Sequence, residues 1–290
     1  MSDLTIENNI EEKQNKKPSN RGRNIELYIG LALCLTIGLA VIFSGYLYPD
    51  GGMKIDLRNR LLEPFTNWSN PLGTDPLGRD ILARIVVGGK ISLMVGVLSV
   101  LGSTVLGVAI GLVAGYYRGV WDMILMRCAD IQLALPFILI AIVFAATLGS
   151  SVENIIYFMI LSQWVGFARV VRSSVLSLRE REFVQSAQSF GVSDFTIIIR
   201  HVLPNSFNAI LILMVLSIGN NILLESSLTF LGLGSDPSTP SWGGMLADGR
   251  SYMQTAWWVC VFPGLAIMFT VLGTNLVGDW LRDKTDPTSA

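Results

Sequence analysis

Residues 183–205, FVQSAQSFGVSDFTIIIRHVLPN, are a polar and amphipathic stretch flanked by two strongly apolar runs, residues 154–168 and 202–224. Apolar runs of this kind predict membrane crossings. The stretch between them then lies at the membrane surface. It is either a docking place for a soluble partner or an ordinary amphipathic loop resting on the bilayer.

The local pattern of this stretch predicts a helical hairpin. Its first half contains good helix formers and places three apolar residues on one face: Phe183, Ala187 and Phe190. Gly191 can take the left-handed conformation that ends a helix. Ser193 is a natural N-cap for a second helix, which is expected to stop before Pro204.

Working outward, the rest of the chain predicts an all-α polytopic membrane protein with six transmembrane helices. The 290 residues are 51% hydrophobic and only 15% charged, against about 25% charged in soluble domains. Crossing a bilayer takes about 20 apolar residues. Six segments without Asp, Glu, Lys or Arg meet or approach that length: residues 27–48, 91–115, 131–152, 154–168, 202–224 and 251–278.

Basic residues predict that both termini are cytoplasmic, because Lys and Arg concentrate on that side. They cluster before the first run and follow the last one, at Arg282 and Lys284. The predicted division of the chain is a disordered cytoplasmic tail (1–24), a first span with an external segment (25–90), a five-helix core with a cytoplasmic loop at 171–205 (91–283), and a C-terminal tail (284–290).

The external segment is expected to contain an interfacial helix. Asp75 and Pro76 suit an N-cap and a first helical position. Two pairs at i,i+4 spacing can form ion pairs on its surface: Asp75 with Arg79, and Asp80 with Arg84. Such a helix either shapes the outer mouth of a pathway or rests on the bilayer without a direct role.

Small and polar residues within the spans give further expectations. Glycines at 107, 111 and 115 permit close helix approach, and Pro136 and Pro263 predict kinks. Asn220, Asn221 and Glu225 lie deep in the fifth span. They either line a solute pathway or form interhelical hydrogen bonds.

Several chemistries are disfavoured by the composition. The net charge of −1 gives no field for nucleic acid. One histidine and three scattered cysteines make metal, disulfide and cofactor sites improbable, so we expect a protein without catalytic residues. A phosphate-binding loop needs G-x4-G-K-[ST]. Gly89 and Lys90 form the only Gly-Lys pair, and Arg84 stands where the first glycine is required.

The hairpin resembles the cytoplasmic signature of permease subunits of ATP-binding cassette importers: E-A-A, three residues, G, nine residues, I-x-L-P. The matching positions are Gln185, Ser186, Ala187, Gly191, His201, Leu203 and Pro204. Gln185, Ser186 and His201 depart from the pattern. Further stretches resemble the C-type permeases of dipeptide, oligopeptide and nickel importers: NPLGTDPLGRDILARIVVGGKISL (70–93), RCADIQLALPFILIAI (127–142), SLTFLGLG (227–234) and PSWGGML (240–246).

This resemblance, which covers about residues 25–285, implies a type I importer permease fold in the cytoplasmic membrane. The implied partners are a second, B-type permease subunit, two ATPase subunits that bind ATP and Mg²⁺, and an extracytoplasmic solute-binding protein. Gln185, Ser186, Ala187, Gly191, Leu203 and Pro204 would form the coupling loop to the ATPase. The implied cargo is a di- or oligopeptide, with nickel or a metal chelate as the alternative.

Two other function classes stay open on the residues alone. A secondary transporter driven by an ion gradient needs coupling carboxylates in paired repeats, and Glu225 is the one candidate. A membrane-embedded enzyme needs paired histidines or carboxylates within the spans, and the single His201 lies outside them.

Overall fold

The computed structural model describes residues 20–234 and 239–285, and every regular element in these ranges is a helix. Most of the predicted tail 1–24, and residues 286–290 of the other tail, lie outside this description. The α-helices and one π turn are, in chain order, α2 (Asn20–Ile42), α3 (Ser44–Leu47), α4 (Ile81–Tyr117), α5 (Gly119–Ala134), α6 (Phe137–Leu148), α7 (Val152–Arg179), α8 (Glu182–Ser189), α9 (Asp194–Ile197), the π turn (Ile198–Val202), α10 (Leu203–Phe230), α11 (Trp242–Gly249) and α12 (Trp258–Thr285). Two short 3₁₀ helices lie at Leu57–Asn59 and Arg250–Tyr252.

The predicted all-α membrane architecture is confirmed. Within the described ranges, α2, α4, α7, α12 and the continuous helix from Asp194 to Phe230 are each long and apolar enough to cross a membrane. The third predicted span is a broken pair, because α5 and α6 meet at 89°. Leu135 is extended at the break, as a residue before proline prefers. Pro263 lies in the second turn of α12, and the helix continues past it to Thr285.

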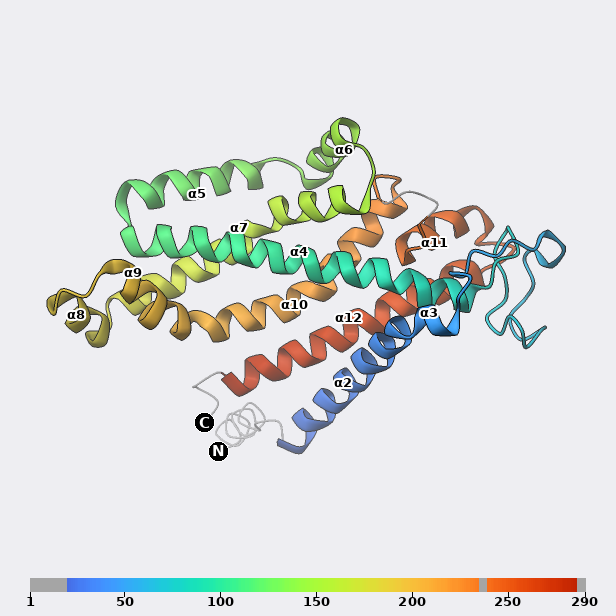
Figure 1. Ribbon diagram of the computed structural model, residues 1–290, viewed down its shortest axis with the longest axis horizontal. Coiled ribbons are helices and arrows are strands. Elements are labelled where there is room, and N and C mark those ends of the chain that lie inside the picture. The colour runs from blue at the N-terminus through green and yellow to red at the C-terminus, as the bar shows by residue number, and fades with distance from the viewer. Residues whose placement is uncertain (1–19, 235–238, 286–290) are drawn as a thin grey trace, which may run out of the picture.

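The α5–α6 pair gives a sixth span if its two bent helices are counted as one broken crossing. Helix α4 ends beside α8 and α9, whereas α7 begins near α6, away from them, and runs back toward them (Figure 1). Residues 118–151 therefore lead from one side to the other. The start of α2 and the end of α12 lie toward the α8–α9 side in the same view, while the 49–80 segment and α11 lie opposite. This arrangement agrees with six crossings and with both ends of the span region on the same side as α8 and α9.

The parallel pair of α4 and α7 forms the centre of the bundle, and its glycines allow close packing. A Cβ atom at Gly107 would lie 2.5 Å from the Phe167 Cβ, and one at Gly111 would lie 2.6 Å from the Ala168 carbonyl oxygen. Side chains larger than hydrogen do not fit there. Close helix approach was the role expected from the spacing of these glycines.

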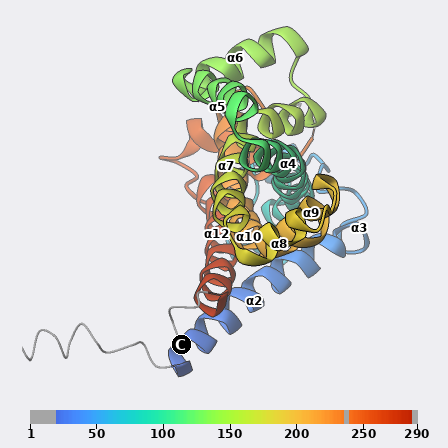
Figure 2. The same cartoon turned by 90° about the vertical axis from the view of Figure 1, so that its left-hand side faces the viewer.

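Helices α5–α6 and α2 flank this centre on opposite sides (Figure 2). Both present apolar side chains outward, including Leu35 and Leu39 on α2 and Ile131 and Leu133 on α5. A membrane protein can expose such surfaces to lipid or to another membrane subunit.

The prediction of a separate interfacial helix starting near Asp75 is wrong, because residues 75–79 form a turn. The Asp75 carboxylate accepts hydrogen bonds from the backbone N–H groups of Leu77 (2.8 Å) and Arg79 (2.9 Å) and closes a turn. Gly78 has a φ of 75°. The helix starts only after Asp80, whose side chain caps it. Residues 81–90 therefore form the first turns of α4. The helix runs without a break through 90/91, where the sequence predicted a boundary between two parts of the chain.

Candidate functional site

The hairpin turn between α8 and α9 is built as its sequence predicts. Gly191 has a φ of 73°. Its N–H donates to the Gln188 carbonyl (3.0 Å), and the Val192 N–H donates to the Ala187 carbonyl (3.1 Å). This pair of bonds is the Schellman arrangement that terminates a helix at a left-handed residue. Ser193 then caps α9, with its side chain accepting from the Thr196 N–H.

The second helix does not stop before Pro204, which corrects the sequence prediction. It passes through the π turn Ile198–Val202 and continues as α10, with Pro204 at its second position. A proline ring clashes with the carbonyl four residues before it in a regular α-helix. The wider turn lies directly before the proline, where such a clash would arise. The hairpin is therefore continuous with the fifth membrane helix.

The hairpin rests on a buried apolar cluster and leaves three aromatic rings outside. Val184 and Ile197 are fully buried against residues of α4, α7 and α10. Phe183, Phe190 and Phe195 are 43%, 87% and 74% exposed. The packed face of α8 is thus centred on Val184 and the half-buried Ala187, and not on the phenylalanines that the sequence grouped with Ala187.

The six predicted coupling residues are distributed over the two arms of this hairpin. Ala187 on α8 and Leu203 on α10 both pack against the buried cluster. The remaining four are exposed: Gln185, Ser186, Gly191 and Pro204. The structure thus brings Ala187 and Leu203 to one core and places the other four at its surface. Their role in coupling stays a prediction.

Sequence reasoning missed Tyr116, which lies under the hairpin turn. Its hydroxyl contacts Asp194 Oδ1 at 2.8 Å and Gln188 Nε2 at 3.2 Å. A tyrosine at the end of an apolar run is the usual residue of a membrane interface, so its position gave no signal of these contacts.

The polar residues of the fifth span occupy different surroundings. Glu225 is fully buried, and its carboxylate accepts hydrogen bonds from the hydroxyls of Ser92 (3.1 Å), Ser226 (3.2 Å) and Thr229 (3.0 Å). Asn221 is buried and donates to Ser99 Oγ at 2.8 Å. Asn220 is exposed. The first two make interhelical bonds within the subunit; a pathway role for the three stays a prediction.

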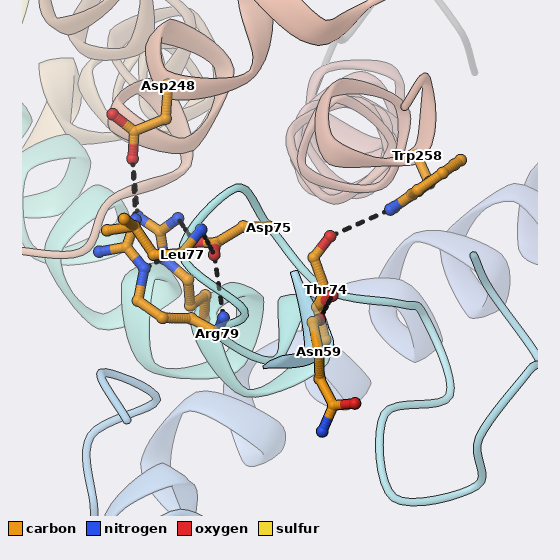
Figure 3. Close-up of polar contacts among 8 residues, drawn as sticks. Asn59, Thr74, Asp75, Leu77, Arg79, Asp248 and Trp258 are labelled. Carbon is orange, nitrogen blue, oxygen red and sulfur yellow. Dashed lines mark hydrogen bonds and ion pairs between the residues drawn. The ribbon is translucent and has the colours of Figure 1, made fainter. Parts of the chain in front are cut away.

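At the opposite end of α4, the outer segment is held by a cluster of four charged residues (Figure 3). Asp75 Oδ2 pairs with Arg79 Nε at 2.6 Å and with Arg84 Nη1 at 2.7 Å. Both arginines also reach Asp248 Oδ2, at 3.3 and 3.1 Å. Arg84 therefore pairs with Asp75 and Asp248, and not with Asp80 as the spacing suggested.

The cluster fixes the outer segment to the membrane helices. Asp75 is fully buried and Arg84 is 2% exposed. Alongside it, the Thr74 carbonyl accepts from Trp258 Nε1 at 3.1 Å, and the Thr74 hydroxyl bonds to the Asn59 carbonyl (Figure 3). Segments 49–80, α4, α11 and α12 are joined at this point.

Comparison with known proteins shows the family to which the chain belongs. Residues 107–289 match the model described as "Binding-protein-dependent transport system inner membrane component". The chain is 43% identical over 260 residues to the dipeptide transport system permease protein DppC of Alkalihalophilus pseudofirmus, covering 89% of this chain and 84% of that protein. It is 47% identical over 269 residues to the glutathione transport system permease protein GsiD of Escherichia coli O6:K15:H31, covering 92% and 88%. The corresponding protein of Pectobacterium atrosepticum is 42% identical over 267 residues, covering 91% and 87%.

Proposed function

Because the chain belongs to the family of binding-protein-dependent transport inner membrane components, we propose that its α8–α9 hairpin couples solute passage to a separate ATPase. The protein itself is a multi-pass, non-catalytic permease subunit of an ATP-binding cassette importer. Its sequence has no phosphate-binding loop. ATP and Mg²⁺ therefore bind to partner subunits.

The exposed aromatic rings of the hairpin are the observation that supports coupling most directly. Phe190 and Phe195 stand out from a cytoplasmic turn, while Val184 and Ile197 fix the base of that turn in the core. Aromatic side chains that are exposed on a rigid support are typical anchors of protein interfaces. A groove on each ATPase subunit that accepts these rings would move the hairpin when the ATPases close.

The remaining partners follow from the family and from the position of the exposed surfaces. A second, B-type permease subunit completes the pathway, with lipid around the pair, and Asn220 is the one of the three predicted lining residues that is on the subunit's surface. An extracytoplasmic binding protein delivers the solute to the outer segment. The Asp75–Arg84 cluster supports that segment as a rigid platform.

The proposed cargo is a short peptide. The relatives named above are a dipeptide permease and a glutathione permease, and glutathione is itself a small peptide. Nickel or a metal chelate, the alternative from the sequence, gains no observation in its favour. Uptake into proteoliposomes that hold the complete transporter and its binding protein compares a dipeptide, glutathione and Ni²⁺ directly. Dipeptide or glutathione uptake that needs ATP is expected, and uptake of Ni²⁺ alone would contradict the proposal.

The hairpin role is tested by replacing both exposed rings, Phe190→Ser with Phe195→Ser. Membrane insertion and thermal stability are expected to stay normal, because neither ring is packed in the core. Co-purification of the ATPase subunits should weaken by about 30-fold or more, the effect of losing an interface anchor. Tyr46→Ser, an equally exposed ring on the opposite side, is the control. Normal ATPase association and normal uptake by the double variant would contradict the proposal.

Transport by the purified chain alone would revive the secondary-transporter alternative. Peptide uptake driven by an ion gradient, in vesicles that lack ATPase subunits, is the decisive measurement.

A further inference from the structure

Tyr116 connects more parts of the hairpin than any residue predicted from the sequence. It is the penultimate residue of α4 and only 2% exposed. Its ring belongs to the apolar cluster that includes Val184 of α8, Ile197 of α9 and Val175 of α7. The side chain therefore reaches from the end of a membrane helix to the underside of the hairpin.

The direction of the hydrogen bonds at its hydroxyl follows from the two partners. An ionised carboxylate accepts only, so the single hydroxyl proton points to Asp194 Oδ1, 2.8 Å away. An oxygen lone pair then accepts from Gln188 Nε2 at 3.2 Å. Gln188 precedes the Gly191 turn and Asp194 follows it. One hydroxyl thus holds both sides of the turn.

A third connection comes from α7. The Arg179 guanidinium donates from Nη1 to the Tyr116 carbonyl oxygen, and its central carbon lies 5.4 Å from the centre of the Tyr116 ring. Arg179 is the last residue of α7. The ends of α4 and α7 and the two short hairpin helices therefore meet at Tyr116.

Apart from these hydrogen bonds and the Arg179 contact, the cluster under the hairpin is apolar, which gives the hydroxyl a distinct task. Apolar packing resists separation but has little directional preference. Hydrogen bonds weaken steeply when their angle changes. Helix α8 has eight residues, too few to hold its own geometry in water, whereas α9 is the first turn of the continuous helix from Asp194 to Phe230. The orientation of α8 on the cluster therefore depends on directional contacts. The Tyr116 hydroxyl provides one to Gln188 of α8 and one to Asp194 at the start of the long helix.

We propose that the Tyr116 hydroxyl is a positioning group that transmits movement of the hairpin to α4. This inference rests on the proposed coupling function of the hairpin. Removing the hydroxyl leaves the hairpin docked on its apolar cluster and able to bind an ATPase. The turn can then shift without moving α4, so ATP is hydrolysed with less solute transported.

Tyr116→Phe tests this in the complete transporter, reconstituted with its ATPases, second permease and binding protein. We expect ATPase co-purification and the rate of ATP hydrolysis to stay within about twofold of the parent. The number of solute molecules transported per ATP should fall about tenfold, the effect of losing one charge-assisted hydrogen bond. Tyr117→Phe is the matched control, because Tyr117 is 47% exposed and its hydroxyl has no hydrogen-bond partner in the described part of the chain. Parent-like transport per ATP in Tyr116→Phe overturns the inference.

A second variant covers the case in which Tyr116→Phe does not assemble. Gln188→Ala combined with Asp194→Ala removes both partners of the hydroxyl and leaves the buried ring in place. The same loss of transport per ATP is expected, and adding Tyr116→Phe should cause no further loss. Normal transport per ATP overturns the inference. Loss of stability and of ATPase binding, with transport per ATP unchanged in the complexes that remain, also overturns it, because that result marks a purely structural residue. Failure of the coupling function itself appears separately, as intact ATPase binding and uptake in the Phe190/Phe195 double variant.

Discussion

The two ends of α4 are anchored by different chemistry. At the outer end, Arg84 is buried between Asp75 and Asp248, and the contacts join four segments of the same subunit. At the inner end, the Tyr116 hydroxyl holds a short hairpin whose phenylalanines remain exposed. The outer end is held by contacts within the subunit, whereas the inner end leaves its aromatic rings exposed, where the proposed ATPase would bind. Substitutions at the outer end should therefore affect stability, and those at the inner end should affect coupling.

The largest expected effect is at the outer anchor. Asp75→Asn leaves Arg84 and Arg79 without their buried carboxylate, which costs about 3–5 kcal/mol when one partner of a buried ion pair is removed. Asp248→Asn should cost about 1 kcal/mol or less, since that side chain is 42% exposed. The stability of both variants is measured in detergent by unfolding them with heat or denaturant. Equal stability of the two variants would show that the outer end is not anchored by burial.

The next prediction concerns the middle of α4, where it packs closely against α7. In Gly111→Val the new Cβ lies 2.6 Å from the Ala168 carbonyl oxygen and 2.8 Å from Val171 Cβ, and such overpacking costs about 1–3 kcal/mol. Gly166→Val is the control in α7, where a Cβ meets no atom within 4 Å. If Gly111→Val proves as stable as the control, α4 joins the two ends without close support from α7.

The smallest expected effect is at the cap of α4. Burial is the main cause that raises the pKa of Asp80, against the hydrogen bonds from Leu82 and Ala83, which lower it. A carboxyl whose pKa is raised on folding binds its proton more tightly in the folded state, so stability declines as pH rises from about 4 through the folded pKa. Asp80→Asn keeps a good cap and should remove that decline, with a change of about 0.5 kcal/mol or less at neutral pH.

The measurement for Asp80 is the midpoint of unfolding as a function of pH. Asp80→Ala, which loses the cap, should be about 1 kcal/mol less stable than Asp80→Asn at every pH. A parent protein whose stability rises between pH 4 and 7, with the same rise in Asp80→Asn, would contradict the assignment.

Sequence patterns predicted the membrane helices well because the apolar runs are long, and they predicted the hairpin turn because Gly191 and Ser193 suit few other roles. The start of α4 was placed ten residues late. Arg84 and Lys90 interrupt the uncharged run, and the charge of Arg84 is neutralised by Asp75 and by Asp248, far along the chain. A short stretch of sequence around Arg84 cannot reveal Asp248 as its partner.

The candidate site shows the same limit. Its local geometry follows from residues within a few positions of Gly191, whereas its support comes from Tyr116, far away along the chain. The continuation past Pro204 was also missed, since the π turn that precedes it depends on Ile198 and Val202 packing in a tertiary core. The sequence near Gly191 predicts the geometry of the hairpin turn, whereas contacts with distant residues fix the hairpin to the membrane helices.

The unbroken course of α4 has a consequence for how this protein can vary. Arg84 and Tyr116 are separated by about nine helical turns, which puts them within about 40° of the same side of the helix. One residue inserted between them would rotate one anchor against the other by about 100°. The number of residues between Arg84 and Tyr116 thus sets the rotation of the outer cluster relative to the hairpin around the helix axis. Between these two anchors, α4 therefore has to keep its residue count.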